Sequence, residues 1–347
     1  MSGEFMNQHR GELAQLRDLS ARIGGDPLLT QASTGNTSIK LDDVLWIKAS
    51  GRWLADAKHE DILVPLDFSE VKRYLSQQVD PADIYACASI ETAMHAVLPH
   101  PVVLHVHSVN TIAWAVREDA RQQLQRHLDG LRWQWIPYVP SGLPLAQKIK
   151  SVLSASGNAN VLVLGNHGLV IAGASCEEVT QLLSEVERRL AVPPRPANPA
   201  DYDALDEITE GSSWGLPEDD GIHALAIDLI SRAILSGGIL FPCQSIFSNS
   251  TSPEMFQALP YPLSIAQRDS LYLTRTFLMI AGRGVIVRKT MTSSQHAMMS
   301  GLAQVVRRIN FTAPIHYLSD EEVEYSRTIA TRYLEKADAV PMNTSAA

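Results

Sequence analysis

A helix followed by a strand that ends in two histidines constrains this chain more than any other stretch. Residues 89–107 read SIETAMHAVLPHPVVLHVH: a helical pattern containing Glu91, a stop at Pro99, and an apolar strand ending at His105 and His107. Side chains two residues apart on a strand point to the same face. We therefore expect both imidazoles on one side of the strand, at a separation suited to holding one ion.

A third candidate ligand lies 60 residues after His107. His167 sits in VLVLGNHGLVIAG, a strand that breaks at Gly165-Asn166 and resumes after Gly168. Three neutral imidazoles with an open position commonly hold a catalytic zinc, because a closed four-ligand site leaves no room for substrate. Single histidines on strands are more often structural, so an ordinary core or surface role is the alternative. No CxxC or zinc-finger spacing accompanies the three histidines.

Length, charge and cysteine content narrow the class of protein. The 347 residues suffice for one large or two moderate domains, and a 45% hydrophobic content can fill a sizeable core. The net charge of −9 argues against nucleic acid or an anionic membrane as the main partner. Cys87, Cys176 and Cys243 are odd in number and far apart, which indicates reduced thiols in a cytoplasmic protein. No apolar run of about 18 residues is present to span a membrane.

Apolar spacing in the first 190 residues predicts helices mixed with strands. The expected helices are 8–23, 67–76, 89–98, 108–118, 120–128, 145–153 and 175–190. The expected strands include 37–40, 44–48, the strand that ends at His107, 160–164 and 169–171. The first two strands form a hairpin that turns at Asp42-Asp43. This order indicates an α/β or layered α+β fold.

Two small polar loops flank that hairpin. Gly35-Asn36-Thr37-Ser38 opens its first strand, and Ser50-Gly51 follows its second. Such loops can turn backbone N–H groups and hydroxyls toward an anion. The same residues also make ordinary turns. Neither loop alone therefore identifies an anion site.

The composition changes after residue 192, which predicts a boundary. Residues 193–199 hold four prolines, and 201–220 hold eight acidic residues and no Lys or Arg. We expect domains at 1–192 and 221–347, joined by a linker at 193–220. In the second part we expect a helix at 222–235, a strand at 239–247, a short helix capped by Ser252-Pro253, a hairpin at 273–288, and helices at 292–308 and 319–336.

The C-terminal part is expected to be a folded α+β extension that packs on the first domain. Its strands and helices are too regular for a disordered tail. It either covers the metal cleft, enlarges an oligomer interface, or is merely structural. Arg283, Arg288 and Lys289 are candidates for neutralising an anionic substrate, although such charges on a hairpin commonly serve solubility.

Six motifs together resemble the class II aldolase/adducin family, which includes L-fuculose-phosphate and rhamnulose-phosphate aldolases and ribulose-phosphate 4-epimerase. They are GNTS at 35–38, ASG at 49–51, SIETAMH at 89–95, HPVVLHVHS at 100–108, PYVPSGLPLA at 137–146 and GNHGLVIAG at 165–173. They follow the family's order and cover about residues 10–190. The C-terminal part is more loosely similar to long-form members related to rhamnulose-phosphate aldolase/dehydrogenase fusions. No GxGxxG follows a strand here, so a dehydrogenase fingerprint is absent.

The resemblance implies a class II aldolase-like central sheet flanked by helices, and a role for each motif residue. His105, His107 and His167 would bind Zn²⁺ or another divalent transition metal, and Glu91 would be the acid/base residue. A substrate phosphate would be held by Gly35, Asn36, Thr37, Ser50, Gly51 and Ser89. One departure is Ile90, which stands where the family commonly has a second serine. One hydroxyl donor is thereby lost, which puts a strict phosphate requirement in doubt.

The resemblance also implies a reaction. We expect a zinc-dependent aldolase, a lyase that cleaves or forms a C–C bond in a ketose or ketose phosphate through a metal-stabilised enediolate. Glu91 favours aldolase or dehydratase chemistry, because the family's epimerases resemble a pattern with Asp at this place. The alternatives are an epimerase or decarboxylase on a sugar or sugar-acid phosphate, and a non-catalytic adducin-like binding protein. The family further implies a homotetramer with the site near a subunit boundary.

Overall fold

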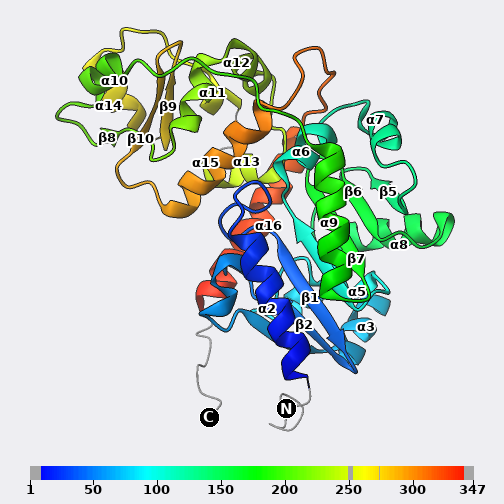
Figure 1. Cartoon of the computed structure of the whole chain (residues 1–347). Coiled ribbons are helices and arrows are strands. Elements are labelled where there is room, and N and C mark those ends of the chain that lie inside the picture. The colour runs from blue at the N-terminus through cyan, green and yellow to red at the C-terminus, as the bar shows by residue number, and fades with distance from the viewer. Residues whose placement is uncertain (1–8, 249–252, 273, 340–347) are drawn as a thin grey trace.

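A seven-stranded sheet organises the N-terminal half of the chain (Figure 1). The computed structural model describes residues 9–248, 253–272 and 274–339. The strands are β1 Asn36–Leu41, β2 Val44–Lys48, β3 Leu63–Asp67, β4 Val102–Val106, β5 Trp133–Ile136, β6 Val161–Leu164 and β7 Gly168–Gly173. Their order is β3-β2-β1-β4-β7-β6-β5, with every neighbouring pair antiparallel except β5 and β6. The central strand β4 carries His105.

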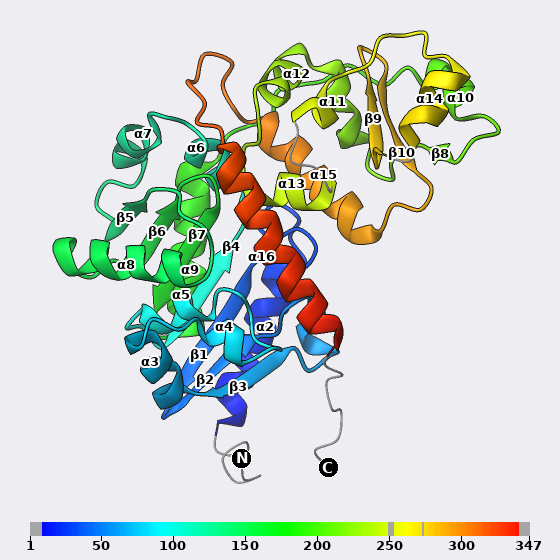
Figure 2. The same cartoon turned by 180° about the vertical axis from the view of Figure 1, so that it is seen from behind.

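Helices cover both faces of this sheet, as expected. The helices of this half are α2 Arg10–Gly24, α3 Phe68–Ser76, α4 Pro81–Ile84, α5 Thr92–Val97, α6 Val109–Ala115, α7 Ala120–His127, α8 Leu143–Ser156 and α9 Cys176–Leu190, with a 3-10 turn at Leu54–Lys58. Figures 1 and 2 show α2 and α9 over one face and α5 and α8 over the other. On β4, Leu104 packs toward α2 and α9, whereas Val103 packs toward α5 and α8. By alternation, His105 shares the face of Val103.

Strand β3 is absent from the elements predicted by apolar spacing, because its sequence, LVPLD, contains Pro65. Proline cannot donate to a ladder and is tolerated mainly on edge strands. β3 is such an edge strand, paired on one side with β2. The hairpin of β1 and β2 turns at Asp42 and Asp43 as predicted, and Asp42 adopts a left-handed φ of 49° there.

The C-terminal region is a folded α+β unit built around a three-stranded antiparallel sheet in the order β8-β10-β9. Its strands are β8 Trp214–Gly215, β9 Phe277–Ile280 and β10 Gly284–Arg288. Its helices are α10 Tyr202–Thr209, α11 Ala224–Ile227, α12 Leu229–Ser236, α13 Pro242–Ser248, α14 Ile265–Tyr272, α15 Ser293–Val306 and α16 Asp320–Ala339, with 3-10 turns at Asp220–His223 and Pro253–Phe256. The turn from β9 to β10 falls at 281–283, where the hairpin was expected.

Two expectations for this region need correction. Residues 239–247 were expected to be a strand, but α13 occupies most of them and only Ile239 makes a bridge, to Leu318. An apolar run does not distinguish a buried strand from a buried helix, and Pro242 suits a first helical turn. The expected helix 222–235 breaks at Asp228, whose side chain caps α12. Ser252, the expected cap of the next turn, lies outside the described residues.

The expected linker at 193–220 also differs from the structure. It contains α10 and β8, and β8 pairs with β10 in the C-terminal sheet. The acidic composition suggested a solvated segment, yet Leu205, Ile208 and Trp214 are buried against that sheet. Acidic side chains occupy the outer positions of an amphipathic helix here, so composition alone hid the pattern.

The two halves share a hydrophobic core. Ile112 on α6 and Val116, which directly follows that helix, are buried in one cluster with apolar residues of α11, α13 and α15. Backbone hydrogen bonds also join the halves, from Glu118 N to Pro314 O at 2.9 Å and from His316 N to Val116 O at 2.8 Å. Figure 2 shows α16 running across the side of the sheet opposite α2 and α9. Within the described residues, no helix combines the length and apolar character needed to cross a bilayer.

Candidate active site

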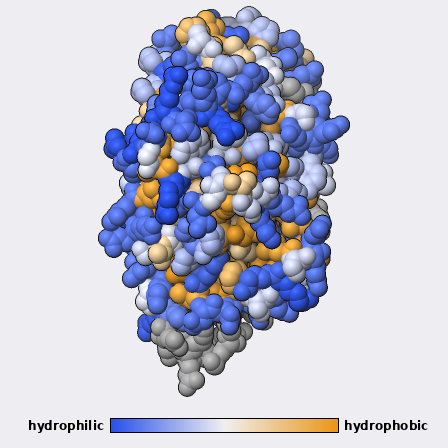
Figure 3. All heavy atoms as spheres, turned by 90° about the vertical axis from the view of Figure 1, so that its right-hand side faces the viewer, coloured by the Kyte–Doolittle hydropathy of each residue, from blue (hydrophilic) through white to orange (hydrophobic). Residues whose placement is uncertain are grey.

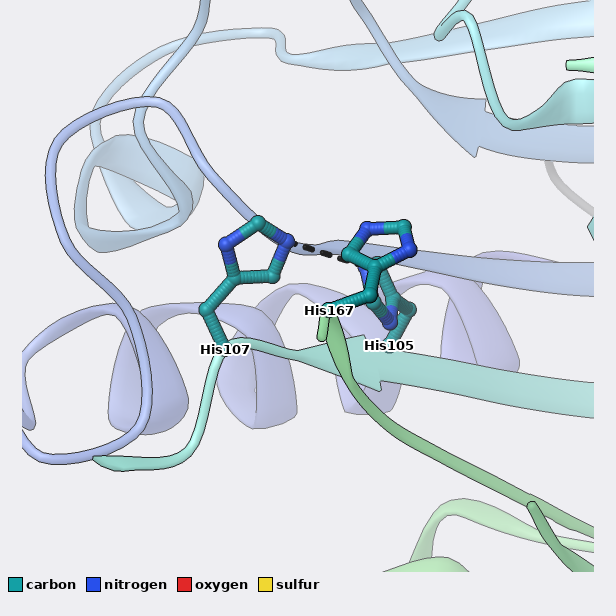
Figure 4. A group of neighbouring side chains, drawn as sticks. All are labelled: His105, His107 and His167. Carbon is teal, nitrogen blue, oxygen red and sulfur yellow. Dashed lines mark hydrogen bonds between the residues drawn. The ribbon is translucent and has the colours of Figure 1, made fainter. Parts of the chain in front are cut away.

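Three histidine side chains meet at one end of the central strand. His105 lies on β4, His107 one residue beyond its end, and His167 in the turn between β6 and β7. Their ring centroids are 4.9, 5.0 and 5.1 Å apart, close to an equilateral triangle. One nitrogen of each ring lies within 4.8 Å of the other two, and all three residues are buried. Figure 4 shows the rings facing one another.

Local backbone geometry lets the three rings come this close. β6 and β7 form a hairpin beside β4, and Asn166 turns the chain with a φ of 51° just before His167. A Cβ on Gly168 would lie 2.5 Å from the carbonyl oxygen of Val106 and 3.3 Å from Cε1 of His105. A larger residue at position 168 would therefore push β7 away from the imidazoles.

The hydrogen bonds of His105 define which nitrogen faces the centre. Its Nδ1 lies 3.0 Å from the carbonyl oxygen of Leu169, and a carbonyl only accepts, so Nδ1 carries the proton. Nε2 then presents a lone pair, 3.2 Å from Nε2 of His107. Burial lowers the pKa of His105 to about 4 and that of His107 well below its ordinary value. Neutral imidazoles are the form that binds a metal.

Glu91 lies beside the three imidazoles and contacts two of them. It is the N-cap residue of α5, not a residue within the helix as expected. Its Oε2 lies 3.3 Å from Nε2 of His105 and its Oε1 lies 3.2 Å from Nε2 of His167. Burial acts to raise the pKa of Glu91, but the facing imidazoles outweigh it and hold the pKa well below its ordinary value.

These donors fit a divalent cation. The Oε1 atom of Glu91 is buried and accepts no hydrogen bond from the described residues, despite the nearby His167. An ionised carboxylate left in that state is costly unless a cation balances it. Neutral nitrogens beside a carboxylate oxygen are ligands that zinc and similar ions accept. The geometry thus supports metal binding on chemical grounds.

A chain of buried hydrogen bonds holds Glu91 in place. Asn36 donates from Nδ2 to Oε2 of Glu91 at 2.8 Å. The Oδ1 atom of Asn36 pairs with Nε2 of His95, which must therefore donate. Nδ1 of His95 then accepts from the hydroxyl of Ser38 at 2.7 Å. Burial lowers the pKa of His95 to about 3, which agrees with the neutral ring that this chain requires.

A cleft of about 200 Å³ opens beside the cluster. The sequence-predicted residues that line it are Gly35, Asn36, Ser50, Gly51, Ser89, Glu91, His107 and His167. Gly35 has a φ of 68°, and a Cβ there would lie 2.8 Å from the carbonyl oxygen of His105. The first polar loop can therefore approach the metal site only because this residue is glycine.

Thr37 is the exception among the predicted binding residues. Its hydroxyl lies 2.7 Å from the hydroxyl of Ser20 on α2, and its side chain is fully buried. β1 alternates, so Asn36 and Ser38 point toward the cluster while Thr37 points to the opposite face. Thr37 belongs to the polar loop beside the cleft. Because side chains alternate along β1, its own side chain points away from the cleft.

Comparison with known proteins identifies the family of the N-terminal half. The family described as Class II Aldolase and Adducin N-terminal domain matches residues 15–192. The chain belongs to this family. The resemblance seen in the motifs is thus confirmed for the N-terminal half of this class II aldolase/adducin protein.

The individual relatives described next each match only part of this family member. The Bacillus subtilis (strain 168) protein named uncharacterized oxidoreductase YuxG is 29% identical over 181 residues, covering 46% of this chain and 26% of that protein. The chain thus spans about a quarter of the length of that curated relative. Solved structures include the N-terminal class II aldolase domain of a conserved protein from Thermoplasma acidophilum (TM-score 0.45, 22% identity) and L-fuculose-1-phosphate aldolase from Thermus thermophilus (0.39, 18%). Each covers 52% of this chain, and the match spans 92% of each of them.

Two residues of the class II aldolase/adducin domain were not predicted to contribute to the site. Lys48 lines the cleft, and its Nζ donates to the carbonyl oxygens of Ser33 at 2.8 Å and Arg52 at 2.6 Å. Burial lowers the pKa of Lys48 to about 7. His95 enters the sequence prediction only as part of a motif. Its spacing of four residues from Glu91 was a usable signal, since such residues share a helix face.

The three C-terminal cations proposed for an anionic substrate lie elsewhere in this family member. Arg283 pairs with Asp201, Arg288 donates to the carbonyl oxygen of Tyr272, and Lys289 donates to that of Ser212 at 2.9 Å. None of the three is among the described residues that line the cleft. Their contacts fit a structural role on the hairpin.

Proposed function

We propose that this protein is a zinc-dependent aldolase, a lyase acting on the C–C bond of a ketose or ketose phosphate. The observation that carries the proposal is the buried cluster of His105, His107 and His167 facing Glu91 beside a cleft. His105, His107 and His167 would hold the metal, and His107, His167 and Glu91 line the cleft from which a substrate would reach it. Family membership supports the same class of chemistry.

A divalent metal held by the three histidines would act as a Lewis acid that stabilises negative charge developing on substrate oxygens. Glu91 moves the proton. In the cleavage direction its carboxylate takes the proton of the hydroxyl next to the scissile bond, that bond breaks to an aldehyde, and the other fragment is left as an enediolate. The same carboxyl group then returns the proton to carbon. Asn36 occupies Oε2, which leaves Oε1 for the proton.

The polar loops supply the binding groups at the other end of the substrate. Gly35, Ser50, Gly51 and Ser89 line the cleft, where their backbone N–H groups and hydroxyls suit a phosphate. Lys48 also lines the cleft, but two carbonyl oxygens already accept from it, and its pKa of about 7 means that its charge is partly lost at neutral pH. Since Ile90 offers no hydroxyl, we expect weaker phosphate dependence than two serines would give.

The same enediolate chemistry also serves epimerases and decarboxylases acting on sugar or sugar-acid phosphates. Family membership does not separate these reactions from aldol cleavage. A non-catalytic adducin-like role is less compatible with a buried carboxylate beside three buried imidazoles, because burying these groups costs folding free energy that a purely structural role does not require.

We also propose a homo-oligomer, with a tetramer as the specific expectation. Figure 3, which views the side of β5 and α8, shows apolar side chains gathered in the lower half of that face. Apolar patches of this kind often mark association surfaces. A monomer measured by light scattering at micromolar concentration would contradict this.

Metal analysis and a substrate panel test the proposal. Zinc should be present at about one ion per chain in wild type and be strongly reduced in His105→Ala, while His59→Ala, at an exposed histidine, should match wild type. Zinc-loaded protein is then offered ketose 1-phosphates, their unphosphorylated forms and sugar-acid phosphates, with products identified by mass. An aldehyde and a dihydroxyacetone-type product support the aldolase. An epimer as the only product would identify an epimerase, and CO₂ as the only product would identify a decarboxylase. Equal, near-zero zinc in wild type and both variants would reject the metal site.

A further inference from the structure

The cleft beside the histidine cluster has two walls of opposite chemical character. The N-terminal domain supplies the polar wall, including Glu91, Lys48 and the small polar loops. The C-terminal region supplies the other, in which Pro242, Ile246 and Met298 lie with residues of α16. The cleft is therefore amphipathic across its width.

The apolar wall comes from three helices that meet at the cleft. Ile246 lies on α13, Met298 on α15, and Ile329 and Ala330 on α16. Ile246, Met298 and Ile329 are only partly buried in the chain itself, so each leaves apolar surface toward the opening. Ile90 of the N-terminal domain lines the same cleft and extends this surface.

Two sets of hydrogen bonds fix the wall relative to the metal site. Asn166, next to His167, donates from Nδ2 to the carbonyl oxygen of Leu240 at 2.8 Å, two residues before α13. The hydroxyls of Tyr138 and Ser326 lie 2.9 Å apart, which ties α16 to the N-terminal domain. The wall is thus anchored at both ends and belongs to the same chain as the metal ligands.

This wall contributes no charged side chain among the described residues that line the cleft. Its polar members there are Cys243, Tyr325 and Ser326. A charged or heavily hydroxylated group placed against Ile246, Met298 and Ile329 would lose water without gaining partners. An alkyl group would instead bury apolar surface, at about fourfold in affinity for each methylene.

We propose that the C-terminal wall selects a ligand with an apolar segment, so that the substrate is a metal-chelating compound carrying a short alkyl portion next to its oxygenated head. This inference rests on the proposed metal site. Ile246 and Ile329 are its specificity-determining residues. The C-terminal region thereby takes part in substrate recognition from within the same chain.

A series of alkyl hydroxamates tests this without knowledge of the substrate, because a hydroxamate chelates zinc through two oxygens. Aceto-, butyro- and hexanohydroxamate are titrated calorimetrically into the full-length, zinc-loaded chain. Four methylenes separate the shortest from the longest, so affinity should rise by up to about 250-fold when all four are buried. In the double variant Ile246→Ala/Ile329→Ala, the gain in affinity from acetohydroxamate to hexanohydroxamate should be at least fivefold smaller. Acetohydroxamate itself should bind as in wild type. Leu229→Ala, at a 72% exposed residue on α12, should keep the full rise.

The outcomes separate the two proposals. If acetohydroxamate fails to bind zinc-loaded wild type, the metal site and this inference both fall. If it binds but affinity is independent of chain length, or if the double variant keeps the wild-type rise, the metal site stands and the apolar wall does not select the ligand. Unchanged zinc content and acetohydroxamate affinity in the double variant show that its fold is intact.

Discussion

Cys243 Sγ, on α13 of the C-terminal region, lies 3.5 Å from Nδ1 of His107. Burial raises the pKa of Cys243 to about 12, so the sulfur keeps its proton at neutral pH. A thiol can donate to a bare Nδ1 or accept from a protonated one. A neutral His107 that coordinates a metal through Nε2 carries its proton on Nδ1, so the thiol must accept from Nδ1. Cys243 then becomes the acceptor that orients this ligand, a role that usually falls to a carboxylate or carbonyl group.

Replacing Cys243 should therefore weaken metal binding. We expect Cys243→Val to lose about tenfold to a hundredfold in zinc affinity, because His107 loses its acceptor. Cys243→Ser should retain most of the affinity, since a hydroxyl can accept. Competition with a zinc chelator measures the affinity, and the visible spectrum of the Co²⁺ form reports ligand geometry. Cys87→Ser is the control. Wild-type affinity and spectrum in Cys243→Val would show that the contact has no effect on the ligand.

Glu91→Gln should keep the metal and lose most turnover. The amide has the size of the carboxyl group but cannot carry the proton, and general acid–base steps are typically worth about 10² to 10⁴ in rate. Zinc content and turnover of the substrate found in the panel are measured together. A Glu91→Gln protein that retains turnover would move the acid/base role to another group.

His95→Phe should lower turnover about tenfold while zinc content stays near that of wild type. His95 donates to Oδ1 of Asn36 and so keeps the Asn36 amide aimed at Glu91. Without that donor the amide can rotate and present oxygen to the carboxylate. Ser38→Ala is the milder companion, because it removes one buried hydrogen bond worth about 1 kcal/mol but leaves the donor of His95. Equal turnover in His95→Phe and wild type would contradict the orienting role.

A chain ending near Ala197 should be poorly soluble and much less stable than the full chain. The cut exposes Val109 and Ile112 on α6 and Val116 just after it, which are buried against the C-terminal region. Several apolar side chains returned to water cost about 1.5 to 3 kcal/mol each. Thermal unfolding and zinc content provide the measurements. A truncated protein that is soluble, folded, metal-loaded and as active as the full chain would make the C-terminal region dispensable.

Local patterns were enough to single out the three neighbouring histidines, because those patterns are short. Strand alternation put His105 and His107 on one face, and the break after Gly165 put His167 in a turn beside them. The family resemblance supplied the expected roles of Glu91 and the polar loops. Alternation also explains the one misplaced side chain, since Thr37 lies between Asn36 and Ser38 on β1. Their roles in binding and catalysis remain predictions.

The C-terminal wall could not be predicted in the same way. Cys243 and His107 are 136 residues apart, and no local period reports such a contact. The run ILFPCQSIF was assigned to a strand because its apolar residues fit either element. Tertiary packing against α15 and α16 decides in favour of a helix. Periodicity was enough to predict a folded extension, whereas its position over the cleft required the structure.

Asn166 joins the two halves of the protein at the residue preceding His167. Its Nδ2 donates to the carbonyl oxygens of Leu240 and His316, and its Oδ1 accepts from Nδ1 of His316 at 3.0 Å. Displacing the C-terminal region would break all three bonds and release the turn that holds His167. Ion binding at the proposed metal site would therefore be thermodynamically linked to docking of the C-terminal region. By reciprocity, each strengthens the other by the same free energy.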